Sequence, residues 1–114
     1  MTDTIFERIL RKEIPATVVY EDECIIAFKD INPQAPVHVL VVPKQKFASF
    51  SDLEDADTKI VGELFTRAAK VANQLGLQRD GYRVVTNIGK YGQQSVDYIH
   101  LHILGGRQLS WPPG

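Results

Sequence analysis

The chain has 114 residues, enough for one domain with a single hydrophobic core. Its composition, 44% hydrophobic and 24% charged, is typical of a globular protein, and its net charge of −1 argues against a nucleic-acid duplex as a partner. No segment approaches the roughly 18 consecutive apolar residues that cross a membrane, and residues 1–4 lack the features of a secretory signal, so we expect a cytoplasmic protein, in a eukaryote also a nuclear one.

The N-terminus predicts a short helix. Thr4 and Glu7 have the spacing of a capping box, in which the two side chains satisfy free N–H groups at the start of a helix. The helix should continue to about residue 12 and end before Pro15, because proline disrupts the interior of a helix.

Strands are predicted in the next part of the chain. Residues 17–21 and 24–29 contain many β-branched and aromatic side chains and flank an acidic turn, which indicates a β-hairpin. The single cysteine, Cys24, cannot form an internal disulfide and is expected to be a small buried side chain of the second strand. Residues 30–36 contain two prolines and predict a loop, and residues 37–42 predict another strand.

The second half of the chain predicts one long helix and two more strands. Apolar residues recur at helical spacing and mark one buried face, formed by Ile60, Leu64, Ala68, Val71 and Leu75. Gly76 is placed to end this helix. Residues 82–86 and 98–104 predict strands. Residues 1–114 should therefore form one α+β domain, a five-stranded antiparallel sheet with one long and one short helix.

The last predicted strand is the most informative segment. Residues 98–104 alternate polar and apolar side chains, so His100 and His102 should project side by side on one face of the sheet, while the apolar residues point into a core. The third histidine, His38, lies in another predicted strand, and a glycine-rich segment, residues 87–95, precedes the pair. Imidazoles on a strand beside a loop with free N–H groups suit chemistry on a phosphate.

Three interpretations of the histidines are open. They could be structural residues, satisfied in a core or at the surface. They could be the three ligands of a catalytic zinc ion; such ligands normally have carboxylate partners, but only Asp97 is adjacent, and alternation places it on the face opposite His100. In the third interpretation, one imidazole attacks phosphorus while a hydrogen bond to its other ring nitrogen fixes the tautomer. The residues fit this third interpretation best, and it needs no metal.

A set of segments spread over the whole chain carries a family resemblance. They are Thr4–Phe6, Arg11–Pro15, Asp30–His38, the residues Asn87, Gly92, Gln94 and Ser95, the strand Tyr98–Leu104, Gly105–Arg107 and the ending Trp111–Gly114. Together they resemble the histidine triad (HIT) superfamily, and most closely its Hint branch, the nucleoside phosphoramidases. The Trp-Pro-Pro-Gly ending is characteristic of that branch, and the number of separate matches argues against coincidence.

The resemblance implies roles for the catalytic residues. His100 matches the residue that attacks the α-phosphorus and becomes transiently nucleotidylated. His102 matches the last triad histidine and His38 the further histidine of that site, and both would position the phosphate. Ser95 matches a hydroxyl near the leaving group.

The resemblance also implies nucleotide-binding residues. Asn87 matches a phosphate contact, Gln94 lies in the same binding segment, and Asp30 matches the acid that binds the ribose hydroxyls. Without the resemblance, Asp30 would be interpreted as a turn-forming acid, and the apolar residues as ordinary core. An apolar pocket for the purine is implied for Phe6, Ile9, Phe28, Ile31 and Leu40.

The implied reaction is hydrolysis of a purine nucleoside 5′-phosphoramidate, or of an aminoacyl adenylate, to AMP or GMP without a cofactor. Two alternatives stay open: a dinucleoside polyphosphate hydrolase or nucleotidyltransferase of the same superfamily, and a nucleotide-binding interaction protein with incidental turnover. The resemblance further implies a homodimer in which residues 82–86 and the long helix pair across a two-fold axis and Trp111 reaches the partner's site.

Two positions depart from the family pattern. Tyr98 stands where the first triad histidine is usual, and Asp97 where relatives often carry an aromatic residue. In the family, the main-chain carbonyl of that first residue is thought to hold the ring N–H of the nucleophile. A carbonyl survives substitution, so Tyr98 puts the rate and the leaving-group preference in question, but not the identity of the nucleophile.

Overall fold

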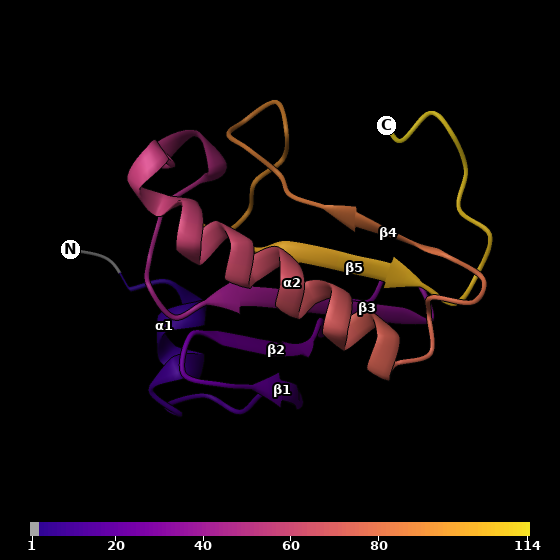
Figure 1. Cartoon of the computed structure of the whole chain (residues 1–114), viewed down its shortest axis with the longest axis horizontal. Coiled ribbons are helices and arrows are strands. Elements are labelled where there is room, and N and C mark those ends of the chain that lie inside the picture. The colour runs from indigo at the N-terminus through magenta and orange to yellow at the C-terminus, as the bar shows by residue number, and fades with distance from the viewer. Residues whose placement is uncertain (1–2) are drawn as a thin grey trace.

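The computed structural model describes residues 3–114; Met1 and Thr2, part of the region expected to lack a secretory signal, lie outside it. Within the described range, five antiparallel strands form one sheet in the order β1-β2-β3-β5-β4 (Figure 1). The predicted α+β fold, with one long and one short helix, is confirmed. The elements are α1 (Ile5–Leu10), β1 (Val18–Glu21), β2 (Ile25–Lys29), β3 (Val37–Pro43), η1 (Phe50–Asp52), η2 (Asp55–Asp57), α2 (Thr58–Gln74), β4 (Tyr82–Val85) and β5 (Leu101–Gly105).

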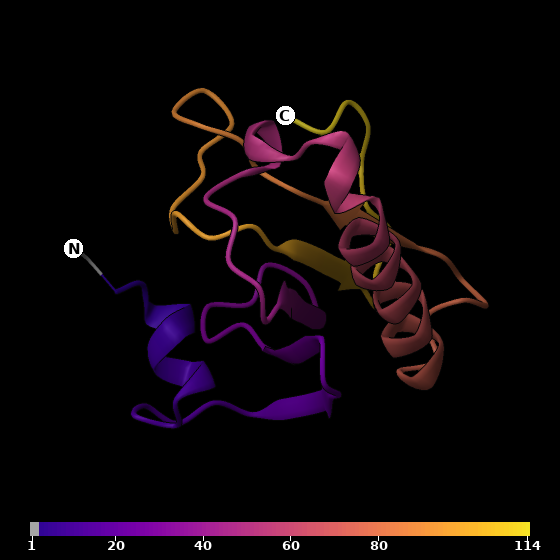
Figure 2. The ribbon, with the colours of Figure 1, turned by 60° about the vertical axis from the view of Figure 1, so that its left-hand side comes forward.

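The two α-helices lie on opposite faces of the sheet (Figure 2). Since side chains alternate along a strand, each inner strand contributes to two cores. The core under α2 contains Ile25, Ala27, Val39, Val41, Leu64, Ala68, Val71, Ala72, Leu77, Leu101 and Ile103. The core on the other face joins α1 to the sheet through Phe6, Ile9, Ile26, Phe28, Leu40, Val42 and Tyr98.

The long helix follows its sequence pattern. Leu64, Ala68 and Val71 are buried, and Ile60 and Leu75 pack against the same core. Gly76 follows the helix with a φ of 77°, a left-handed conformation that glycine adopts readily. Among the described residues, no helix has both the length and the apolar character needed to cross a membrane.

The short helix α1 begins with the predicted capping box. The Thr4 N–H donates to Glu7 Oε1 at 2.9 Å, and the Glu7 N–H donates to Thr4 Oγ1 at 3.4 Å. The helix ends at Leu10, about two residues earlier than predicted. Lys12 has a φ of 61°, so the chain has already left the helical conformation there.

Two strand predictions need correction. The last strand begins at Leu101 rather than Tyr98, because the preceding backbone bonds outside the sheet: the Tyr98 N–H donates to Val96 O and the Ile99 N–H to Phe47 O. Cys24 is only half-buried and precedes β2, where its N–H donates to Asp22 Oδ1 in the turn. The 3-10 helices η1 and η2 had no prediction.

Candidate active site

The three histidines lie together on the sheet face that α1 partly covers. His38 comes from β3 and His102 from β5; Leu40, two residues after His38, pairs directly with His102. His100 immediately precedes β5. The ring centroids are 5.2 Å apart for His38 and His102 and 4.9 Å apart for His100 and His102. The predicted side-by-side placement of His100 and His102 is therefore present, although His100 lies just outside the strand.

One hydrogen bond fixes the tautomer of His100. Its Nδ1 lies 2.7 Å from the main-chain oxygen of Tyr98. Because a carbonyl oxygen only accepts hydrogen bonds, Nδ1 must carry the ring hydrogen. In the neutral ring, Nε2 then keeps a free lone pair, which is the requirement for an imidazole nucleophile.

The tautomers of His38 and His102 follow from a second set of contacts. The Gln34 N–H donates to His38 Nδ1 at 3.0 Å, so the hydrogen of neutral His38 is on Nε2. That Nε2 lies 2.9 Å from His102 Nδ1 and donates to it. The hydrogen of neutral His102 is then on its own Nε2, available as a donor. Asp30 Oδ2 lies 3.4 Å from His38 Nε2 and favours the same tautomer.

Burial keeps the three rings neutral. It lowers the pKa of His38 and His100 below the usual histidine range, although Asp30 opposes the shift in both cases. For His102, burial and the two neighbouring histidines lower the pKa to about 4. Near neutral pH, the cluster therefore offers one nitrogen lone pair, at His100, and neutral N–H donors, with no imidazolium.

Four of the five apolar residues expected around a purine are buried together beside the histidines. Phe6, Ile9, Phe28 and Leu40 belong to the core on the α1 face. The Phe6 ring meets the His100 ring edge-on, with centroids 4.9 Å apart. The fifth residue, Ile31, does not join this cluster and is 92% exposed.

Asp30 lies closer to the histidines than the sequence suggested. Its Oδ1 accepts the Asn32 N–H at 2.8 Å, which directs Oδ2 toward His38. Asp97 is the carboxylate next to the histidine pair in the sequence, whereas Asp30 is adjacent to none of the three histidines along the chain. Its main-chain N–H donates to His38 O at 3.0 Å, so the end of β2 and the start of β3 bring the two residues together.

The glycine-rich segment is a tightly folded loop. Gly92 packs so closely that a Cβ there would lie 2.5 Å from Ile88 O, and Asn87 Nδ2 donates to the Gly92 carbonyl at 2.7 Å. Gln94 is occupied by the backbone: its amide group donates to Ala48 O and Val96 O and accepts from the Gly89 N–H. Ser95 is exposed. Ser95 is therefore accessible from solvent. The Gln94 side chain instead links the loop at Gly89 to the main chain at Ala48 and at Val96.

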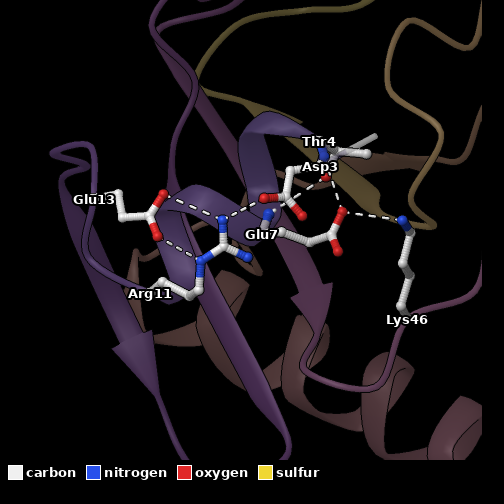
Figure 3. Close-up of polar contacts among 6 residues, drawn as sticks. All are labelled: Asp3, Thr4, Glu7, Arg11, Glu13 and Lys46. Carbon is white, nitrogen blue, oxygen red and sulfur yellow. Dashed lines mark hydrogen bonds and ion pairs between the residues drawn. The ribbon is translucent and has the colours of Figure 1, made fainter. Parts of the chain in front are cut away.

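Ion pairs anchor α1 beside the site (Figure 3). Lys46, in the segment after β3, lies 3.0 Å from Glu7 of the capping box. Arg11, at the end of the helix, lies between Asp3 and Glu13 and pairs with both. Since α1 carries Phe6 and Ile9, the pair between Glu7 and Lys46 ties this wall of the apolar cluster to the segment after β3, whereas the pairs of Arg11 stay within the N-terminal segment.

Trp111 was expected to reach the site of a partner chain. In the single chain described, it lies beside β4. It is 80% exposed, and the Arg83 guanidinium lies 5.9 Å from its ring centroid. Arg83 also donates to Ser110 O at 2.7 Å. These contacts hold the tail beside strand β4, at one edge of the sheet.

Within residues 3–114, Asp30, His38 and His102 form a group of side chains that could hold a metal ion. Their potential ligand atoms lie within 4.8 Å of one another, and two imidazoles with a carboxylate suit zinc chemically. This set differs from the three histidines of the zinc interpretation, because Asp30 takes the place of His100. In this group of three, His38 Nε2 and His102 Nδ1 are already joined by a hydrogen bond, which a metal would have to replace.

A match to the HIT domain family covers residues 11–109. The chain is 56% identical to a 14 kDa zinc-binding protein of Zea mays over 113 residues, which is 97% of this chain and 88% of that protein. A HIT family hydrolase from Legionella pneumophila superposes with a TM-score of 0.95 at 49% identity, covering 98% of this chain and all of the other. A histidine triad nucleotide-binding protein from Candida albicans gives 0.82 at 28% identity, covering 98% and 85%.

Proposed function

Because the chain belongs to the HIT domain family, we propose that it hydrolyses purine nucleoside 5′-phosphoramidates, or aminoacyl adenylates, to the nucleoside monophosphate. The observation that carries this proposal is the hydrogen bond from His100 Nδ1 to Tyr98 O, which leaves Nε2 as a free nucleophile. The hydrolase from Legionella and the nucleotide-binding protein from Candida support the class of reaction and of ligand.

The proposed reaction has two steps. The Nε2 lone pair of His100 attacks the α-phosphorus, a P–N(His) bond forms, and the bond from phosphorus to the leaving group breaks. A departing amine takes a proton from the medium, and we assign the Ser95 hydroxyl to pass that proton on, donating its own hydrogen as it accepts another from water. Water then attacks the same phosphorus, gives its proton to the medium, and releases the monophosphate and His100. Dividing one displacement into two easier ones is the benefit of covalent catalysis.

Neutral donors would stabilise the charge on the phosphate. The Nε2–H of His102 is free because its Nδ1 accepts from His38. The amide group of Asn87, which uses one of its two hydrogens for Gly92 O, would add a further donor from the loop. Each well-placed donor of this kind contributes on the order of 3 kcal/mol to transition-state stabilisation. We assign Gln94 to holding this loop in place, because its own donors are taken up by main-chain oxygens.

The nucleoside would bind between the apolar cluster and Asp30. Phe6, Ile9, Phe28 and Leu40 would contact the purine, and Ile31, so exposed in the free chain, would be covered by the base. Each oxygen of an ionised carboxylate accepts more than one hydrogen bond, so Asp30 can keep its contact with Asn32 and still bind ribose hydroxyls.

Zinc binding is a second candidate, supported by the name of the maize relative and by the trio of Asp30, His38 and His102. If a metal bound there, His38 and His102 would give up their mutual hydrogen bond and the ion would neutralise the phosphate. We place this below the metal-free reaction, in which every ring nitrogen already has a defined role. A dinucleoside polyphosphate hydrolase, a nucleotidyltransferase and a nucleotide-binding interaction protein are the remaining alternatives.

A homodimer and a cytoplasmic location complete the proposal. Strand β4 lies at the edge of the sheet, and Val84 is 40% exposed on the face that α2 covers elsewhere. On α2, Phe65 is 47% exposed. Pairing of β4 and α2 with a second copy would bury both side chains.

The deciding experiment is a single turnover with adenosine phosphoramidate labelled at phosphorus. We expect rapid labelling of the protein in an acid-labile bond to His100, located by mass spectrometry, followed by release of AMP. Diadenosine polyphosphates should turn over more slowly than the phosphoramidate. Rapid cleavage of the dinucleotides instead would favour the polyphosphate hydrolase, and binding of AMP with no turnover of either compound would favour the interaction protein.

A further inference from the structure

We propose that Tyr98 is a positioning residue for this reaction: its buried hydroxyl anchors the main-chain oxygen that orients His100. The proposal rests on the proposed function, since it takes His100 as the nucleophile. It concerns the side chain at the position where the sequence departs from the family pattern.

The oxygen that orients His100 has no support from the sheet. Tyr98 precedes β5, and its own N–H donates to Val96 two residues earlier. A carbonyl in an irregular segment can change direction with small rotations of the backbone. Another part of the molecule must therefore hold it.

The last residue of β3, Pro43, and the segment that follows it to Phe47 provide that support from two sides. The Tyr98 hydroxyl donates to Pro43 O at 2.7 Å and lies 3.2 Å from Lys44 O. The Ile99 N–H donates to Phe47 O at 2.7 Å. This N–H and the Tyr98 carbonyl belong to the same planar peptide group. When Phe47 fixes the N–H and the hydroxyl fixes the side chain of Tyr98, the carbonyl can point only toward His100.

The surroundings of the ring strengthen this arrangement. Tyr98 is 1% exposed, and its ring meets the Phe6 ring edge-on with centroids 5.8 Å apart. Phe6 in turn contacts the His100 ring. Phe6 therefore packs against both Tyr98 and the proposed nucleophile. Burial raises the pKa of the Tyr98 hydroxyl to about 12, which keeps it a hydrogen-bond donor throughout the working pH range.

A loosened carbonyl would affect the chemistry directly. Without a fixed acceptor at Nδ1, the neutral His100 ring can exchange its hydrogen between the two nitrogens. The form with hydrogen on Nε2 has no lone pair facing the phosphorus. The Tyr98 hydroxyl should therefore influence the rate of attack and leave nucleotide binding largely unchanged.

The test compares Tyr98→Phe, which removes only the hydroxyl, with Tyr20→Phe as a matched control. Tyr20 also donates its hydroxyl, to Asp22 at 2.7 Å, but packs against the core under α2. For both variants we would measure kcat and KM with adenosine phosphoramidate, the Kd for AMP, and the ring tautomer of His100 by ¹⁵N NMR. The NMR signals report the folded molecules even if a variant is less stable.

We expect Tyr98→Phe to lower kcat by about 10- to 100-fold, the size of effect that a misplaced reactive group causes, with KM and the Kd for AMP nearly unchanged. Its His100 signals should show a mixture of tautomers. Tyr20→Phe should keep the wild-type kcat and tautomer. A wild-type kcat and tautomer in Tyr98→Phe, or an equal loss in both variants, would overturn the proposal.

Tyr98→His provides a second variant in case Tyr98→Phe does not fold. The outer nitrogen of an imidazole lies nearer the main chain than the phenol oxygen does, so it cannot take the place of the hydroxyl beside Pro43 O. Tyr98→His should therefore lower kcat and mix the His100 tautomers as Tyr98→Phe does, with the Kd for AMP nearly unchanged. A wild-type kcat together with a wild-type His100 tautomer in Tyr98→His would also overturn the proposal. A wild-type protein that never forms the nucleotidyl-His100 bond would refute the proposed function itself, whereas an adduct formed equally well by Tyr98→Phe would refute only the role of Tyr98.

Discussion

The ring of Phe6 stands at 86° to the ring of His100, with the two centroids 4.9 Å apart. A residue of the first helix thus buries the side chain that we propose as the nucleophile, although the two are far apart in the sequence. This contact makes α1 part of the site and links helix stability to nucleotide binding.

His100→Ala should lower kcat by several orders of magnitude while the Kd for AMP stays nearly unchanged. The variant removes the attacking nitrogen, but the apolar cluster and Asp30 remain to bind the nucleoside. Stopped-flow turnover and calorimetric titration with AMP would measure the two effects. Turnover within tenfold of wild type would rule out His100 as the nucleophile.

Removal of metal should leave the activity intact, and the purified protein should contain no stoichiometric zinc. The physical reason is that His38 Nε2 and His102 Nδ1 already bind each other, so the proposed reaction uses both rings without a metal. Activity after exhaustive chelation, together with elemental analysis, checks this. If chelation abolished turnover and zinc restored it, the site at Asp30, His38 and His102 would have to be treated as a metal centre.

Thr4→Ala should weaken both the fold and nucleotide binding. The variant removes the side-chain oxygen that accepts the Glu7 N–H, which typically costs about 1 kcal/mol of stability. A frayed α1 displaces Phe6, so the Kd for AMP should rise more than kcat falls. Thr58→Ala is the control, because its hydroxyl bonds to Asp55 O beside α2. An equal change in AMP binding in both variants would show that α1 has no special role.

Acid should destabilise the protein below about pH 6.5, the ordinary pKa of histidine in an unfolded chain. The folded pKa of His102 is about 4, and those of His38 and His100 are also lowered. Between these values the unfolded chain binds more protons than the folded one, so the free energy of unfolding rises with pH across this window. The stabilisation is complete above about pH 6.5 and is lost as the pH falls through about 4.

Two measurements check this pH dependence. Urea unfolding at several pH values should give a smaller slope for His102→Asn than for the wild type. NMR titration of the His102 ring should show a midpoint well below 6.5. A midpoint at the ordinary histidine value would contradict the neutral cluster and the tautomers derived from it.

A homodimer should form at micromolar concentration, and Phe65→Asp should dissociate it. Phe65 is 47% exposed on α2, and a carboxylate there would be costly to bury in an apolar interface. Phe50→Asp is a matched control, since Phe50 is 49% exposed on η1, outside the helix α2 and the strand β4 that we propose to pair. Light scattering would distinguish the two states. A wild-type monomer would refute the dimer.

Local patterns predicted much of this structure. The capping box, the apolar face of α2 and the alternation around His100 and His102 depend on neighbouring residues, and all three are present. The fold class followed from the order of these elements. The predicted start of β5 was wrong. The main-chain N–H groups of Tyr98 and Ile99 donate to residues outside the sheet, and the alternation of polar and apolar residues in the sequence does not reveal this.

Contacts between distant segments could not be predicted. Tyr98 reaches Pro43 across 55 positions, and Gln94 reaches Ala48 across 46. The sequence around Tyr98 does not indicate which distant oxygen accepts its hydroxyl hydrogen. The sequence around Gln94 fits a ligand-binding residue as well as one that holds the loop in place. The closeness of Asp30 to His38 was missed for the same reason, since it depends on how the loop between β2 and β3 closes.

The alternation of β3 has a consequence for how this protein can change over time. Val39 and Val41 support α2, whereas His38 and Leu40 face the site, so substitutions in one set need not disturb the other. Loss or gain of a single residue within β3 would move the side chains beyond that point to the opposite face of the sheet. His38 or the residues that pack with α2 would then face the wrong side. We therefore expect homologues to differ in β3 by substitutions, but not by insertions or deletions.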